Sequence, residues 1–128
     1  MDQIVVVESK KPIDEVCRAL EHAVVENRFG VLHVHDLGKT LAAKGFPLGF
    51  DARVFDVCNP QRAHEVLSAN PALSVALPCA ISVFTEGGQT KLAFIRPTAM
   101  LGLFGSDVLH VAEEVEATVR RIVEAAAA

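Results

Sequence analysis

The sequence predicts one α+β domain in which two long helices cover one face of a mostly antiparallel sheet. The chain has 128 residues, which is the size of a single domain, here taken as residues 1–128. Short β-branched and apolar runs alternate with two longer stretches whose apolar residues recur every three or four positions. Two of the short runs flank Glu86-Gly87-Gly88-Gln89, which is typical of a β-hairpin turn. At least part of the sheet must therefore be antiparallel.

Five apolar runs are predicted to form strands: 4–8, 31–35, 53–58, 80–85 and 91–96. A long helix should follow Pro12 and be capped by Gly30, since Pro suits a first helical turn and Gly a helix end. Residues 37–44 read as a short helix or turn. Asn59 and Pro60 are the cap and first residue expected of a short helix between the third and fourth strands.

The last part of the chain is predicted to form an irregular apolar loop followed by a second long helix. The loop spans 97–104, and Ser106 can cap the helix. The buried stripe of this helix is formed by Val108, Val111, Ala112, Val115, Val119 and Ile122. The resulting order, β-α-β-(short α)-β-(short α)-β-β-α, is that of a two-layer α+β sandwich with both long helices on one face.

Composition narrows the classes of function. Hydrophobic residues make up 51% of the chain, the net charge is −4, and mean hydropathy is +0.33. Basic residues never exceed two in a row and the chain has no Trp or Tyr, so nucleic-acid binding is not expected. No apolar run approaches the ~20 residues of a membrane helix, and the start of the chain lacks an export signal. We therefore expect a cytoplasmic protein that does not bind membranes.

Both faces of the predicted sheet carry apolar side chains, which is unusual for a sheet with helices on one side. In the third strand Phe55 and Val57 point one way, while Val54 and Cys58 point the other. The second apolar set needs a cover: the 97–104 loop, a bound ligand or a second subunit. We expect a homodimer, because closed symmetric dimers are the commonest oligomers.

Four short segments together resemble a known protein family. They are Asp36-…-Thr40-Leu41-…-Lys44, Cys58-Asn59-Pro60, Leu77-Pro78-Cys79 and Pro97-…-Met100. This pattern is similar to the prokaryotic domain-of-unknown-function family 302. The resemblance implies a β-α-β(4)-α fold of the TATA-binding-protein-like class, with a helix inserted between the third and fourth strands, and a compact homodimer. It implies no activity, because fold does not carry function.

Cys58 and Cys79 are the first candidates for chemistry. Cys58 directly precedes a helix cap, where backbone N–H groups and the helix dipole would lower the pKa of a thiol. If the third and fourth strands are antiparallel, as the resemblance implies, both thiols lie at one end of the sheet. They could form a soft-metal site, a redox couple or a disulfide, or fill the strand ends as small buried hydrophobes. With three widely spaced cysteines, a disulfide framework is not expected.

His33 and His35 are the second candidates, since alternate residues of a strand share a face. Such a pair can bind a metal if a third ligand is near, and Asp36, Asp56 or Cys58 could supply it. We therefore list His33, His35 and Cys58 as candidate metal ligands. The alternative is a partly exposed pair on a sheet face or at a dimer interface.

The apolar loop 97–104 is the third candidate. It could be a lid over a pocket, or it could tuck into the core or a dimer interface. The candidate ligand-binding residues are Cys58, Asn59, Cys79, Met100 and Phe104. The function that we favour is a binding module for a small molecule or a soft metal. The alternatives are a thiol-based redox protein or enzyme using Cys58, and a purely structural or regulatory partner; the sequence names no cofactor.

Overall fold

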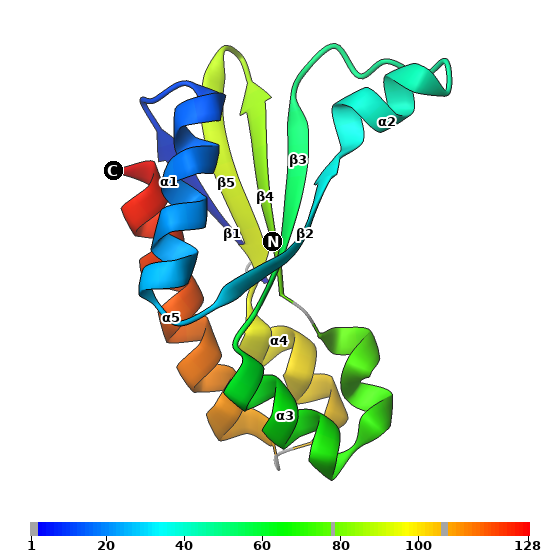
Figure 1. The fold of residues 1–128 in the computed structure, drawn as a ribbon, viewed down its shortest axis with the longest axis vertical. Helices are drawn as coiled ribbons and strands as arrows, with labels where there is room; N and C mark the ends of the chain where they lie inside the picture. The colour runs from blue at the N-terminus through cyan, green and yellow to red at the C-terminus, as the bar shows by residue number, and fades with distance from the viewer. Residues whose placement is uncertain (1–2, 78, 106–107) are drawn as a thin grey trace.

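One five-stranded sheet, antiparallel throughout, organises the computed structural model, which describes residues 3–77, 79–105 and 108–128. The strands lie in the order β1-β5-β4-β3-β2 (Figure 1). Their bounds are β1 Ile4–Ser9, β2 Gly30–Asp36, β3 Ala52–Cys58, β4 Cys79–Glu86 and β5 Gln89–Ile95. The helices are α1 Ile13–Glu26, α2 Leu37–Ala43, α3 Pro60–Ala69, α4 Pro97–Leu101 and α5 Leu109–Ala127, with 3₁₀ turns η1 Pro71–Ala76 and η2 Gly102–Phe104. The two-layer α+β sandwich predicted from the sequence is confirmed.

The register gives the sheet two different faces. One row of side chains runs across four strands through Val5, Phe94, Ile81 and Phe55, and it faces α1 and α5. The β4–β5 hairpin turns at Gly87 and Gly88, whose φ angles of 60° and 78° favour glycine.

The next row forms part of the open face, which is the sheet face turned away from α1 and α5. Its members alternate with the core residues along each strand: Ile4, Val6, Val54, Asp56, Ala80, Ser82, Phe84, Ala93 and Ile95. Val6 and Ile95 are 52% and 47% exposed. Both faces are therefore apolar, as predicted.

The core lies between the sheet and the two long helices, which pack side by side (Figure 1). Leu20 of α1 and Ile122 of α5 are completely buried, and they belong to the same hydrophobic core as Ile81 and Leu92 of the sheet. The whole predicted stripe of α5 is buried as well. Burial of one apolar stripe per helix therefore fixes this layer.

Two local predictions are wrong. Helix α1 ends at Glu26 rather than being capped by Gly30, and Arg28 adopts the left-handed conformation with φ 62° while Gly30 begins β2. The segment 97–104 is not an irregular loop but forms α4 and η2, because Pro97 occupies the first helical turn, where its missing N–H matters least. The predicted cap Ser106 lies outside the described residues.

The short helices sit outside the sandwich. α3 and α4 lie beyond one end of the sheet, and α2 projects from the far end of β2 (Figure 1). Asn59 caps α3 as predicted, its side chain accepting a 3.1 Å hydrogen bond from the Arg62 backbone N–H.

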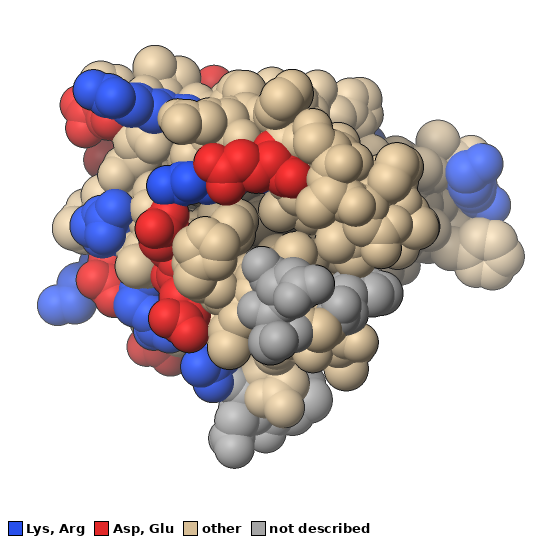
Figure 2. All heavy atoms as spheres, turned by 90° about the horizontal axis from the view of Figure 1, so that it is seen from below, with Lys and Arg blue, Asp and Glu red and all other residues tan. Residues whose placement is uncertain are grey.

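Viewed toward the α3 and α4 end, acidic and basic side chains gather on one side, and uncharged side chains cover much of the other (Figure 2). None of the described helices has the length and apolarity needed to cross a membrane.

Candidate functional site

An apolar pocket lies where β4 begins and β5 ends. The two strands are antiparallel neighbours, so Cys79 and Ile95 come to the same end of the sheet. The pocket has a volume of about 120 Å³. Its walls are aliphatic or sulfur-containing side chains: Val75, Ala76, Cys79, Ala80, Ile95, Pro97, Met100 and Leu101. Such a lining, with its predominantly apolar side chains, suits an apolar group.

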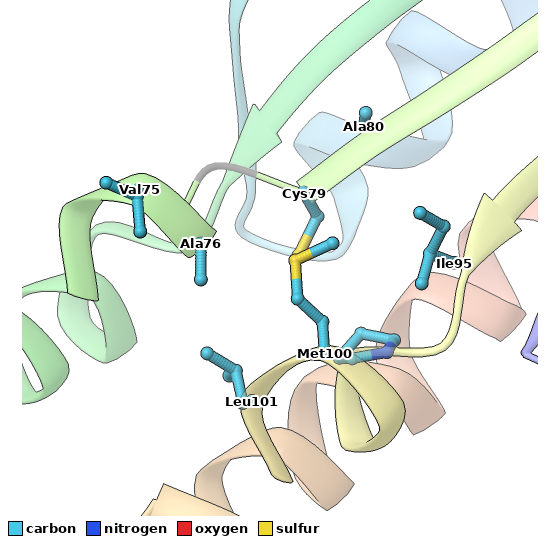
Figure 3. Close-up of a pocket in the computed structure, with 8 residues that line it drawn as sticks. Val75, Ala76, Cys79, Ala80, Ile95, Met100 and Leu101 are labelled. Atoms are coloured by element: carbon cyan, nitrogen blue, oxygen red, sulfur yellow. The ribbon is translucent and has the colours of Figure 1, made fainter. Parts of the chain in front are cut away.

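Each side of the pocket comes from a different element. Met100 and Leu101 follow Pro97 by three and four residues, which places all three on one side of α4. The Met100 side chain rises toward Cys79, with Ala76 of η1 and Ile95 of β5 on either side (Figure 3). The flexible thioether of methionine adapts to irregular spaces, so this wall can adjust to an occupant.

Glu116 of α5 fixes the start of α4. Its carboxylate accepts hydrogen bonds from the Thr98 hydroxyl at 2.6 Å, the Thr98 backbone N–H at 3.1 Å and Arg96 Nε at 3.2 Å. Burial by itself raises the pKa of Glu116, but these hydrogen bonds and the Arg96 charge outweigh it and hold the pKa below its ordinary value. An ionised carboxylate therefore anchors the helix that carries Met100 and Leu101.

Cys58 and Cys79 lie close to each other, as predicted from the antiparallel strands. Both line a second cavity of about 20 Å³, which adjoins α3, and Cys79 also lines the larger pocket. The residue before Cys58, Val57, is the direct cross-strand partner of Cys79. All three cysteines of the chain are free, so the two thiols form no disulfide in this structure.

The structure does not support the lowered pKa that the position beside a helix cap suggested for Cys58. Burial raises the pKa of Cys58, and burial followed by the neighbouring Cys58 raises the pKa of Cys79 to about 11. At the start of α3 the Arg62 N–H donates to the Asn59 side chain and not to the thiol. Both cysteines are therefore protonated at neutral pH and are weak nucleophiles.

His33 and His35 share the open face with Asp56 of the neighbouring strand. Their ring centroids are 4.4 Å apart, and His35 Nε2 lies 2.7 Å from Asp56 Oδ2. Within the described part of the chain, no three or more His, Cys, Asp or Glu side chains are arranged to hold a metal ion. The structure does not show a metal centre at His33, His35 and Cys58, and that assignment remains a prediction from the sequence.

Comparison with known proteins identifies the family of the chain. The model of the family described as "Domain of unknown function DUF302" matches residues 5–126. The chain belongs to the DUF302 family. A crystal structure of an uncharacterized conserved DUF302 protein from Bacillus stearothermophilus superposes with a TM-score of 0.93 at 27% sequence identity. The match covers 98% of this chain and 99% of that one. No protein of curated function matches the chain.

The structure brings together only part of the ligand site predicted for this DUF302 protein. Cys79 and Met100 line the larger pocket, whereas Cys58 and Asn59 line the adjoining small cavity. The Phe104 side chain lies outside the described part of the structure. Sequence reasoning missed the contributions of Ile95 and of η1, since an apolar strand end or a short 3₁₀ turn carries no signal of binding.

Proposed function

We propose that this DUF302 protein is a binding module that takes a small apolar group into the pocket between β4, β5, η1 and α4. The observation that carries the proposal is the lining, in which aliphatic and sulfur-containing side chains from four elements converge on one cavity. Ligand pockets are typically lined in this way, with few polar groups.

The size of the pocket limits its occupant. Its volume of about 120 Å³ is slightly below that of an apolar protein cavity of about 150 Å³ known to bind benzene or xenon. Pockets for drug-sized ligands and cofactors have roughly 300–1,000 Å³. The occupant we propose is therefore a short aliphatic or aromatic group, either a free molecule or the apolar end of a larger one.

The protonated thiols favour binding over thiol chemistry. A redox or enzymatic role for Cys58 needs a thiolate, whereas burial raises the pKa of both Cys58 and Cys79. A neutral Cys79 thiol instead acts as a small apolar part of the wall. A purely structural role would leave the pocket without an occupant, which makes ligand binding the property to test.

Methyl NMR tests the proposal directly, because the chain contains two methionines, Met1 and Met100. In protein labelled with ¹³C at the methionine methyls, titrated benzene should shift the Met100 signal saturably and leave the Met1 signal in place. Met100→Leu assigns the signals. A Met100 signal that does not move, or that moves linearly without saturation, would overturn the proposal.

Paired alanine variants supply the control. Ala76 lies in the pocket wall and is buried, so Ala76→Leu should occupy the pocket and remove the saturable shift. Ala42 is exposed on α2, so Ala42→Leu should leave it unchanged. A shift that survives in a folded Ala76→Leu protein would place the benzene elsewhere.

We also propose that the protein is a homodimer. A 13.7 kDa monomer is expected to expose roughly 6,600 Å² of surface, whereas this chain exposes 7446 Å². The chain therefore exposes more surface than an average monomer of its size, and Val6 and Ile95 on the open face are among the exposed apolar residues that a second copy would cover. Sedimentation velocity tests this: a dimer of about 27 kDa is expected at micromolar concentration, and a monomer throughout would refute it.

A further inference from the structure

Three sulfur-containing side chains meet where the two cavities adjoin. Cys79 lines both the larger pocket and the small cavity beside α3, whereas Cys58 lines the small cavity and Met100 the larger pocket. The small cavity has a volume of only about 20 Å³, which is close to the space of a single water molecule. Cys58 and Cys79 therefore border a common space the size of one small ion, and Met100 reaches Cys79 from the larger pocket.

Two further observations place these sulfur atoms near one another. After burial, the second cause that raises the pKa of Cys79 is the neighbouring Cys58 thiol, so the two groups lie within electrostatic range of each other. The Met100 side chain rises from α4 toward Cys79 (Figure 3). Both cysteines are free and only partly buried. The fold thus collects two thiols and a thioether from β3, β4 and α4.

The chemistry of these donors selects the kind of metal. Thiolate and thioether sulfurs are soft ligands and suit copper(I). Magnesium and calcium take oxygen ligands, and a structural zinc ion takes four ligands from Cys, His, Asp or Glu. Among the described residues, neither cavity is lined by a His, Asp or Glu side chain, and no three such side chains, Cys included, form a metal-binding group. Copper(I), which accepts a thioether and needs fewer ligands than zinc, is the ion that fits.

We propose that Cys58, Cys79 and Met100 bind one copper(I) ion at the junction of the two cavities. The ion forms bonds to the Sγ atoms of the two cysteines and to the Sδ atom of Met100. Each thiol loses its proton to solvent as its bond to copper forms, and no electron is transferred. The site needs no apolar occupant in the larger pocket, so this inference does not rest on the proposed function.

Loss of the thiol protons is compatible with burial of the two cysteines. Burial raises the pKa of both, so the metal-free site is neutral. A coordinated metal ion deprotonates a thiol outright, because its charge stabilises the thiolate directly. The complex of copper(I) with two thiolates carries one negative charge. That charge lies beside the positive end of α3, which begins two residues after Cys58.

The larger pocket gives the ion a route to the thiols. Val75 and Ile95 of its lining are 82% and 47% exposed, so the pocket is open to solvent. Met100 lies between this opening and Cys79, and its unbranched side chain is flexible enough to turn aside and then to bind the ion.

Competition with a coloured chelator tests the site. Reduced protein, kept free of oxygen, is mixed with the copper(I) complex of bicinchoninate, from which the wild type should take one equivalent of copper(I). Cys58→Ser and Cys79→Ser should each weaken binding by more than about 100-fold, since even loss of a residue that only orients a metal ligand costs roughly 10–100-fold. Met100→Leu keeps the size of the side chain and should weaken binding about tenfold.

Cys17→Ser is the matched control. Cys17 is the third thiol of the chain, but it belongs to α1 and lines neither cavity. Its substitution should leave the affinity for copper(I) unchanged, and circular dichroism checks the fold of every variant. Equal losses of affinity in Cys17→Ser and Cys58→Ser would overturn the inference.

Methyl NMR gives a second readout that needs no cysteine variant. In protein labelled with ¹³C at the methionine methyls, one equivalent of copper(I) should shift the Met100 signal and leave the Met1 signal in place. A wild type that takes no copper(I) from the chelator, or a Met100 signal that does not move, would overturn the inference. A saturable benzene shift without copper(I) binding would leave the proposed function standing, and copper(I) binding without a benzene shift would leave only this inference standing.

Discussion

Replacing Glu116 by glutamine should destabilise the protein by about 2 kcal/mol at neutral pH. The ionised carboxylate accepts three hydrogen bonds from Arg96 and Thr98, and its side chain is only 14% exposed. A hydrogen bond to a charged group contributes roughly 1.5–3 kcal/mol, and glutamine keeps one accepting oxygen but loses the charge. A loss of this size corresponds to a decrease in melting temperature of roughly 6–12 °C for a domain of this length.

The pH dependence of this effect follows from the lowered pKa. Because the pKa of Glu116 is lower in the folded than in the unfolded chain, its contribution to the free energy of unfolding is complete above the ordinary value of 4.5. The contribution disappears as the pH falls through the folded pKa. The difference in stability between wild type and Glu116→Gln should therefore shrink as the pH falls below the ordinary value of 4.5.

Urea denaturation at several pH values measures both effects. Glu113→Gln is the matched control, since Glu113 is exposed on the same helix and lines a surface groove together with Glu116 and Thr98. Its substitution should change stability by less than about 0.5 kcal/mol. Two results would refute the reasoning. One is a Glu116→Gln protein as stable as Glu113→Gln, and the other is a difference from wild type that does not shrink at any pH below 4.5 at which the protein stays folded.

Two further predictions concern the core and the thiols. Leu20→Ala should lower the free energy of unfolding by about 3 kcal/mol because Leu20 is fully buried. Val25→Ala, on the exposed side of the same helix, should change the free energy of unfolding by less than about 0.5 kcal/mol. Equal losses for the two variants in urea titrations would contradict this prediction. In the folded protein, iodoacetamide at pH 8 should alkylate Cys79 more slowly than Cys58. Both alkylation rates should be lower than in the urea-unfolded chain, and peptide mass spectrometry measures them. Faster alkylation of Cys58 in the folded protein would restore the thiolate hypothesis.

Periodicity predicted the layers of the fold because the two long helices and the strands β3, β4 and β5 each bury a regular row of side chains. The stripe of α5 and the Gly87-Gly88 hairpin illustrate this, since local chemistry and tertiary packing agree there. The prediction failed at 97–104, where an apolar segment without a full helical repeat gave no periodic signal. Its helix depends on Glu116, which is distant in sequence and bonds Thr98 at the helix start.

The candidate site was harder to predict than the fold. Antiparallel pairing correctly placed Cys58 and Cys79 at one end of the sheet, but the sequence favoured a lowered pKa at Cys58. Position beside a helix start is visible in a sequence, whereas burial of the thiol depends on packing between α3 and the sheet. The contributions of Ile95 and Ala76 to the pocket arise only when a strand end and a 3₁₀ turn meet in space.

A crystal structure determined under xenon pressure tests the central claim most directly, because xenon occupies apolar cavities of this size and is located by its electron density. The account predicts a xenon atom in the pocket, in contact with Met100, Leu101 and Ile95, and no xenon there in Ala76→Leu. Xenon bound elsewhere with this pocket empty, or a pocket filled by ordered water, would contradict the proposal that it takes an apolar group.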